Sequence, residues 1–187
     1  ILVMNSVAFA FGDVAYFDIS RPQPTWALDA VAGILGEVFA DQKFMGVFSM
    51  LFGASLVLFL ERVSTRTSTP VRLSVWRNAL LFGIGLLHSL AWDGDVLMVY
   101  ALCAPVLLLL RRLPSHIQVG LGFTVFSLSL ISAWLMGGVD DTAIRSMWTG
   151  SFEHPQEQWA GLLLVVDLMS RSLGMMLIGM GLYSNGF

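Results

Sequence analysis

The sequence predicts an all-α protein, a polytopic transmembrane helical bundle. Hydrophobic residues make up 56% of the 187 residues and charged residues only 12%, which is about half the charged content of an ordinary soluble domain. The mean hydropathy is +0.76, and long apolar runs alternate with short polar stretches. These observations predict a chain that lies in a lipid bilayer.

Six apolar segments are candidates for the spans: 1–11, 44–60, 78–92, 96–110, 117–139 and 162–183. The first is only about half as long as the roughly 20 residues that a span needs, and the chain begins with Ile1. We therefore expect residues 1–187 to be a single transmembrane domain, a fragment of a longer polytopic protein, with a truncated first span. The alternative is a signal-peptide core, because the run from Ala8 to Ala10 resembles a cleavage site, although no basic flank precedes it.

The loops indicate the orientation of these segments. Six of the ten basic residues fall in two loops on one side, namely Arg62, Arg66, Arg72, Arg77, Arg111 and Arg112. By the positive-inside rule this side is cytoplasmic. Most of the acidic residues lie in the opposite loops, so the turn at 88–95 is predicted to lie at the extracytoplasmic face.

Small residues at helical spacing indicate where helices pack closely. Gly46, Ser49 and Gly53 share one face of the second segment, and Ala79 and Gly83 share one face of the third. Such residues let a neighbouring backbone approach. We expect both faces to be helix contacts.

Signatures of soluble enzymes and nucleic-acid binding are absent from the sequence. There is no HExxH or CxxC motif, so no metal site is predicted. Cys103, the single cysteine, lies among apolar neighbours, where packing is its expected role. Basic residues do not alternate with aromatic residues on a polar face, so no nucleic-acid partner is expected.

Two charged residues lie within the last apolar segment. Asp167 and Arg171 are four residues apart, which places them on one helical face where they can neutralise each other. Charges at membrane depth are costly and often mark a substrate or ion path. Both interpretations, a structural ion pair and a functional site, stay open at this point.

Residues 88–95 read "HSLAWDGD" and separate two apolar runs. Trp92 suits a membrane interface, Asp93 and Gly94 suit a turn, and Asp95 suits a helix N-cap. His88 is not explained by the turn. An imidazole near carboxylates at the outer face has the properties of a general base, and the alternative is a buried core histidine.

Several runs resemble one family in the same order along nearly the whole chain. They are "ILVMNSVAFAFGDVAYFD", "KFMGVFSMLFGASL", "LLFGIGLLHSLAWDGDVLMVYAL" and "GMMLIGMGLYSNGF". The family is the YeiB-like (DUF418-domain) family of bacterial inner-membrane proteins, and its most specific motif here is H-x3-WDGD-[VI]-L-x2-Y. This family is distantly similar to transmembrane acyltransferases, which move an acyl group from cytoplasmic acyl-CoA to an acceptor across the membrane.

The resemblance implies acyl-CoA as a co-substrate and a set of roles to test. Arg62, Arg72 and Arg77 would bind its phosphates. His88 would deprotonate an acceptor hydroxyl, and Asp93 or Asp95 would orient the imidazole. Acetyltransferases of the superfamily place a catalytic histidine in the outer loop before the second segment, whereas the corresponding stretch here, "DISRPQPTWALD", has none.

Two other functions stay open. In a transporter or exporter of a small or lipid-like solute, His88 or Asp167 would take up protons. The residues expected to line a substrate path are Asn5, Lys43, Trp92, Tyr100, Asp167 and Arg171. In a non-catalytic scaffold, the same polar residues would hold helices together.

Overall fold

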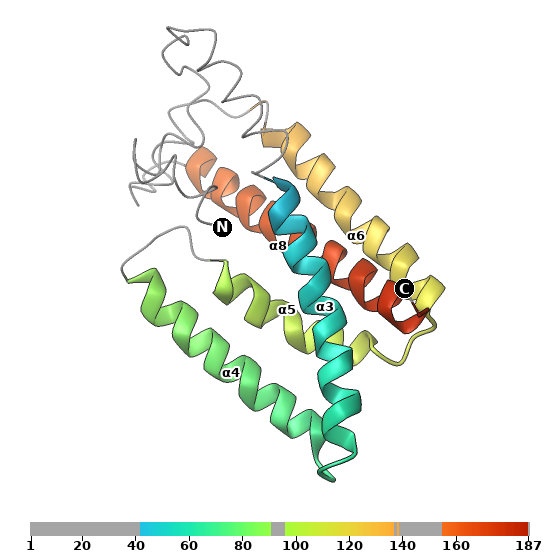
Figure 1. Ribbon diagram of the computed structural model, residues 1–187. Helices are drawn as coiled ribbons and strands as arrows, with labels where there is room; N and C mark the ends of the chain where they lie inside the picture. The colour runs from blue at the N-terminus through green and yellow to red at the C-terminus, as the bar shows by residue number, and fades with distance from the viewer. Residues whose placement is uncertain (1–41, 91–95, 137, 139–154, 187) are drawn as a thin grey trace, which may run out of the picture.

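The computed structural model describes residues 42–90, 96–136, 138 and 155–186 (Figure 1). Within these ranges the chain forms five α-helices and no strand. The helices are α3 (Gln42–Ser64), α4 (Pro70–Ser89), α5 (Leu97–Leu110), α6 (Ser115–Met136) and α8 (Pro155–Ser184). The predicted all-α class is confirmed for this part of the chain.

The largest difference from the predicted segments is at α4. The apolar run predicted a helix over 78–92, but α4 begins at Pro70 and ends at Ser89. Pro70 stands in the first helical turn, where its missing N–H costs no hydrogen bond. Arg72 and Arg77 are helical residues outside the apolar run, so hydropathy alone places the start of the helix too late.

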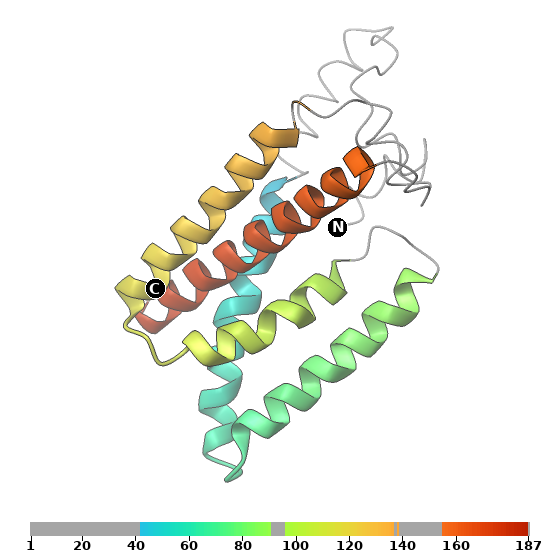
Figure 2. The same cartoon turned by 180° about the vertical axis from the view of Figure 1, so that it is seen from behind.

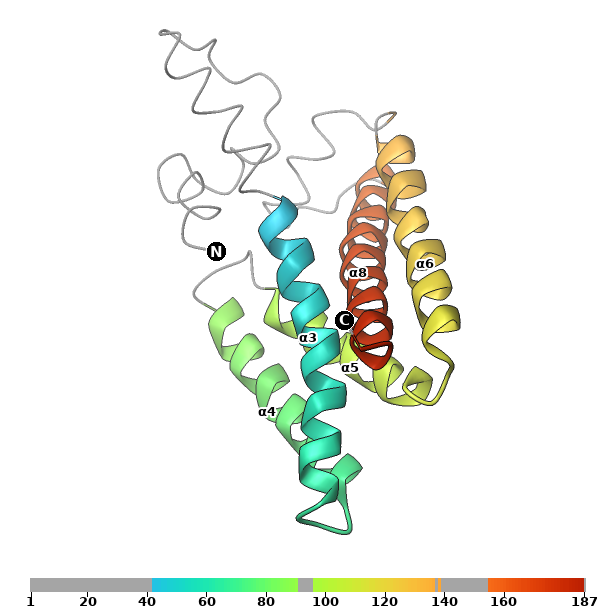
Figure 3. The ribbon, with the colours of Figure 1, turned by 45° about the vertical axis from the view of Figure 1, so that its right-hand side comes forward.

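α8 lies at the centre of the bundle. α6 packs antiparallel along it, and α3 packs on it from another side. Figure 3 shows α3 between α4 and α8. From behind, α6, α8, α5 and α4 follow one another in that order (Figure 2), and each adjacent pair in this order is in contact.

Glycines permit the closest approaches to α8. A Cβ atom at Gly174 would lie 2.8 Å from the carbonyl oxygen of Gly122 on α6. On α3, a Cβ atom at Gly53 would overlap the backbone of Met176. The predicted helix contact through the small residues of α3 is therefore confirmed: Gly46 and Gly53 contact α8, and Ser49 contacts Tyr100 of α5.

The corresponding prediction for the third segment is wrong. Among the residues that the structure describes, none has an atom within 4 Å of a Cβ atom placed at Gly83, and Ala79 is exposed. α4 instead buries Ser74, Asn78 and Gly85. Spacing alone identified a small-residue face, but it could not identify which face of α4 the neighbouring helices cover.

The apolar core is shared by α3, α5 and α8. Leu56, Leu107, Met176 and Met180 have no exposed surface, and Tyr100 is 2% exposed. Contacts between residues of these three helices therefore hold the centre of the bundle together, whereas α4 lies at its periphery.

Three helices of the described part are long and apolar enough to cross a membrane. They are α3 over Lys43–Ser64, α6 over Ser115–Leu135 and α8 over Gln158–Ser184. α5 is apolar but has only 14 residues. The six predicted spans stay a prediction, and the first of them, at 1–11, lies outside the described residues.

Much of the helix surface that faces away from the core is apolar. Leu87 on α4 is 70% exposed and Trp134 on α6 is 79% exposed, with Leu80, Ile84 and Ile131 each more than half exposed. A water-soluble protein rarely exposes so many large apolar side chains together. This surface is consistent with a membrane protein.

Candidate functional site

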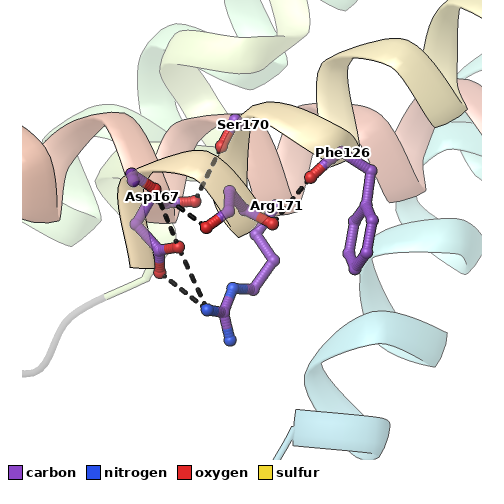
Figure 4. A network of polar contacts seen from close by, with 6 residues as sticks. Phe126, Asp167, Ser170 and Arg171 are labelled. Atoms are coloured by element: carbon purple, nitrogen blue, oxygen red, sulfur yellow. Dashed lines mark hydrogen bonds and ion pairs between the residues drawn. The ribbon is translucent and has the colours of Figure 1, made fainter. Parts of the chain in front are cut away.

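The candidate site is a buried ion pair where α8 meets α6 (Figure 4). Nη2 of Arg171 lies 3.0 Å from both carboxylate oxygens of Asp167. The two residues belong to successive turns of α8, at the spacing predicted from the sequence, and their side chains are 12% (Asp167) and 25% (Arg171) exposed. The predicted pairing on one helical face is confirmed.

A hydroxyl on the neighbouring helix completes the surroundings of this carboxylate. Oγ of Ser132, on α6, donates to Oδ1 of Asp167 at 3.2 Å. Asp167 therefore accepts hydrogen bonds from both helices at once. The guanidinium of Arg171 and the hydroxyl of Ser132 both donate to this carboxylate.

Three serines around the pair also bond to the backbone of their own helices. Ser129 Oγ donates to the carbonyl of Phe126, and Ser170 Oγ donates to the carbonyl of Asp167. Ser132 Oγ lies 3.0 Å from the carbonyl of Ser129, so its single proton is shared between this carbonyl and Asp167. Figure 4 shows these contacts beside the ion pair. These bonds satisfy hydroxyl groups within otherwise apolar helices, and the bond between Ser132 and Asp167 makes the α6–α8 contact polar at this level.

The pair of Asp167 and Arg171 carries one negative and one positive charge, so its net charge is zero when both side chains are ionised. Among the residues the structure describes, no group of three His, Cys, Asp or Glu side chains could hold a metal ion. The Asp167 carboxylate can exchange a proton, and the Arg171 guanidinium can hold an anionic group in place.

Of the three residues predicted to be catalytic, His88, Asp93 and Asp95, the structure describes only His88. His88 lies in the last turn of α4, and its side chain is exposed. The alternative of a buried core histidine is therefore wrong. Trp92, Asp93 and Asp95 lie outside the described residues, as does Asn5.

Tyr100 belongs to a second polar contact, between α5 and α3. Its hydroxyl lies 2.6 Å from Oγ of Ser49, which itself donates to the carbonyl of Met45. The ring of Tyr100 stacks on Phe48, with centroids 5.6 Å apart. Tyr100 thus joins α5 to α3, whereas Asp167 joins α8 to α6. Lys43, in the first turn of α3, is exposed.

The three predicted phosphate-binding arginines have different surroundings. Arg62 is exposed in the last turn of α3. The Arg77 guanidinium lies 4.6 Å from the centre of the Phe59 ring, a cation–π contact that ties α4 to α3. Arg72 lines a groove on the exposed side of α4. The proposed binding of phosphate by these three arginines stays a prediction.

Sequence reasoning missed the serines that complete the two polar contacts. Ser132 and Ser49 are 2% and 1% exposed, although both belong to apolar helices. A polar residue within such a helix is itself a signal of an interhelical contact. The identity of its partner depends on how the helices are arranged.

Comparison with known proteins finds three similar bacterial proteins with sequence identities between 31% and 33%. Uncharacterized protein YeiB of Escherichia coli (strain K12) is 31% identical over 157 residues, which cover 80% of this chain and 38% of the relative. Uncharacterized protein YxaH of Bacillus subtilis (strain 168) is 33% identical over 117 residues, 60% of this chain and 29% of the relative. An uncharacterized 39.9 kDa protein of Bacillus acidopullulyticus is 31% identical over 96 residues, 51% of this chain and 28% of the relative.

The chain thus spans less than half the length of each of these relatives. No family model and no solved structure matches it.

Proposed function

We propose that the chain belongs to the YeiB-like family and forms part of a multi-pass protein of the bacterial inner membrane. We propose further that this protein transfers an acyl group from cytoplasmic acyl-CoA to an acceptor on the other side of the membrane. The similarity to YeiB over 80% of the chain supports the family. The three apolar helices support the membrane location.

The distribution of charged and aromatic residues supports the orientation. Arg66, Arg111 and Arg112 lie in the turns between α3 and α4 and between α5 and α6, and Arg62 and Arg72 lie in the helical turns next to the first of them. Both turns lie in the lower half of Figure 1. Trp134, near the end of α6, and Trp159, near the start of α8, are exposed at the helix ends that lie away from these turns. Tryptophan is enriched at membrane interfaces and Lys and Arg are enriched in cytoplasmic loops, so we place the basic turns inside.

One observation carries the acyl-transfer proposal, namely the exposed imidazole of His88 at the end of α4 opposite the basic turn. The rise from Arg72 to His88 is about 24 Å along the helix, most of the thickness of a bilayer core of about 30 Å. Phosphates of acyl-CoA would be attracted to the exposed Arg62 and Arg66, while the acyl group enters the bundle. His88 is then on the side where the acceptor arrives.

The proposed chemistry is nucleophilic acyl substitution. His88 takes the proton of an acceptor hydroxyl, and the resulting oxygen attacks the thioester carbonyl of acyl-CoA. The new ester bond forms as the carbon–sulfur bond breaks, and the thiolate of coenzyme A leaves and takes up a proton. No other co-reactant is needed.

The test is an acyl-transfer assay on the full-length protein in membranes supplied with labelled acyl-CoA. His88→Ala should lower the rate by about 10²- to 10⁴-fold, which is the usual contribution of a general base. His116→Ala is the matched control, because His116 is also exposed but begins α6 beside the basic turn. Equal activity in the wild type and His88→Ala would contradict the role of His88.

A second function, transport of a small polar solute, is favoured by the buried pair of Asp167 and Arg171. Charged side chains within membrane helices are rare and frequently mark substrate or proton paths. In this alternative, Asp167 exchanges its proton and Arg171 holds an anionic group of the solute.

The assay for transport is pH-dependent solute flux into proteoliposomes that contain the full-length protein. Asp167→Asn should abolish the flux, and Glu61→Gln should leave it unchanged, because Glu61 is exposed at the end of α3. Flux that is unaffected by Asp167→Asn in a folded protein would exclude this path.

A further inference from the structure

The groove that Arg72 lines has a volume of about 570 Å³ and runs along the start of α4, away from the ion pair and from His88. Its lining divides into a polar end and an apolar end. The polar end consists of Thr67, Thr69 and Arg72, and the apolar end consists of Leu73, Val75, Trp76 and Ala79. The groove lies on the exposed side of α4, away from the residues that α4 buries against its neighbours.

The polar end of the groove is suited to an anion. Arg72 provides a full positive charge, and Thr67 and Thr69 provide hydroxyl groups. Oγ1 of Thr67 accepts a hydrogen bond from the Thr69 N–H at 3.3 Å, so its own proton can be donated to another group. A guanidinium beside hydroxyl donors is a common way to bind phosphate oxygens.

The beginning of α4 adds to this positive character. Thr69, at the N-cap position, makes no side-chain capping bond, and the first turn contains no acidic residue. The partial positive charge of a helix N-terminus is therefore not balanced by a side chain. Residues 62–92 contain no acidic residue at all, so the groove lies in a stretch of entirely basic charge.

The apolar end is suited to a hydrocarbon chain. Leu73, Val75 and Trp76 are 45%, 51% and 63% exposed, and they lie further along α4 than the polar end. The apolar stretch of α3 ends at Ser64, shortly before Thr67. The polar end is therefore at the level where the membrane-capable part of α3 ends, and the apolar end returns toward the level of the bilayer core.

From this arrangement we infer that the groove binds an anionic phospholipid of the cytoplasmic leaflet. Its phosphate lies against Arg72 and Thr67, and one acyl chain lies along Leu73 and Trp76. A lipid can enter sideways from the bilayer, because the groove opens on the exposed face of α4. The inference rests on the proposed membrane orientation but not on acyl transfer.

The test measures phospholipid bound to the full-length protein in nanodiscs of phosphatidylcholine with a minor fraction of phosphatidylglycerol. Native mass spectrometry after release from the nanodisc counts the retained lipids. Arg72→Gln should lower the apparent affinity for phosphatidylglycerol about tenfold, the effect of losing one charge-assisted contact. Arg112→Gln is the matched control, because Arg112 is exposed in the other basic turn and does not line the groove.

Two further variants keep the test decisive if Arg72→Gln fails to fold. Arg72→Lys keeps the charge but loses the planar fork, and Thr67→Ala removes one hydroxyl. Each should weaken binding about threefold. Unchanged retention of phosphatidylglycerol in both variants would overturn the inference.

Competition distinguishes the lipid from other phosphates. Inorganic phosphate and acyl-CoA, added separately to the nanodiscs, should not displace phosphatidylglycerol. Displacement by acyl-CoA would assign the groove to the co-substrate and overturn the lipid assignment. An equal loss of lipid in Arg112→Gln would attribute the binding to the general charge of the inner face and would also overturn it. Because the readout is bound lipid, an inactive acyl-transfer assay does not affect the result.

Discussion

Replacing Asp167 with asparagine removes the negative charge of the buried pair but keeps an oxygen that can accept from Ser132. The expected loss in the free energy of unfolding follows from the Arg171 charge that remains without its partner. Arg171 keeps its positive charge in a position where its side chain is only 25% exposed. Breaking a buried pair by removing one partner costs about 3–5 kcal/mol, and we expect about 3 kcal/mol because the guanidinium is partly accessible.

The double variant Asp167→Asn/Arg171→Gln separates the charge from the packing. Two neutral amides at these positions can still bond to each other and to Ser132, so the double variant should lose only about 1 kcal/mol relative to the wild type. Each single variant should lose about 3 kcal/mol, which gives strong coupling between the two sites.

The assay is unfolding of the full-length protein in lipid nanodiscs, measured for the wild type, both single variants and the double variant. Additive losses would refute the assignment of a stabilising ion pair to these two residues. The double variant also separates a role in transport from a role in stability, since it should be about 2 kcal/mol more stable than either single variant. If it folds but shows no solute flux, the charges act in transport as well as in stability.

Three further predictions concern contacts between helices. Gly179→Ala should destabilise the bundle by about 2 kcal/mol or more, because the added Cβ atom overlaps the backbone of α3. Gly83→Ala adds its Cβ atom where no described residue lies within 4 Å, so it should be neutral or stabilise the protein by up to about 1 kcal/mol. Thermal unfolding of the two variants compares these effects. Tyr100→Phe should cost about 1 kcal/mol by removing the hydrogen bond to Ser49, and an unchanged unfolding temperature would contradict this. Gln118→Ala should cost about 1–2 kcal/mol, because its amide donates at 3.2 Å to the carbonyl of Leu110, the last residue of α5, and to that of Arg111, which follows it. Hydrogen exchange at the end of α5 should increase.

The sequence predicted the all-α class and the spacing of Asp167 and Arg171, because both follow from local rules. Apolar content identifies helices that lie in a membrane, and residues four apart share a helical face. The start of α4 was missed, since Pro70 opens the helix well before its apolar run begins. The first turns of α4 carry arginines that hydropathy excludes.

The partners of the buried polar residues could not be predicted from the sequence. Ser132 is 35 residues from Asp167 along the chain, and Ser49 is 51 residues from Tyr100. These contacts exist because α6 packs on α8 and α5 lies near α3, and no local pattern specifies such pairings. Gly83 shows the same limit, since its helical spacing predicted a contact on a face that the other described helices leave open.

The most direct test of the proposed function uses sealed inside-out vesicles that contain the full-length protein. Labelled acyl-CoA is added on the side of the basic turns, and the label is sought on acceptors trapped within the vesicles. The proposal predicts label on the trapped acceptors for the wild type and for His116→Ala, and none above background for His88→Ala. Equal labelling of trapped acceptors by His88→Ala and the wild type would contradict it, as would wild-type vesicles that transfer no label from any acyl-CoA.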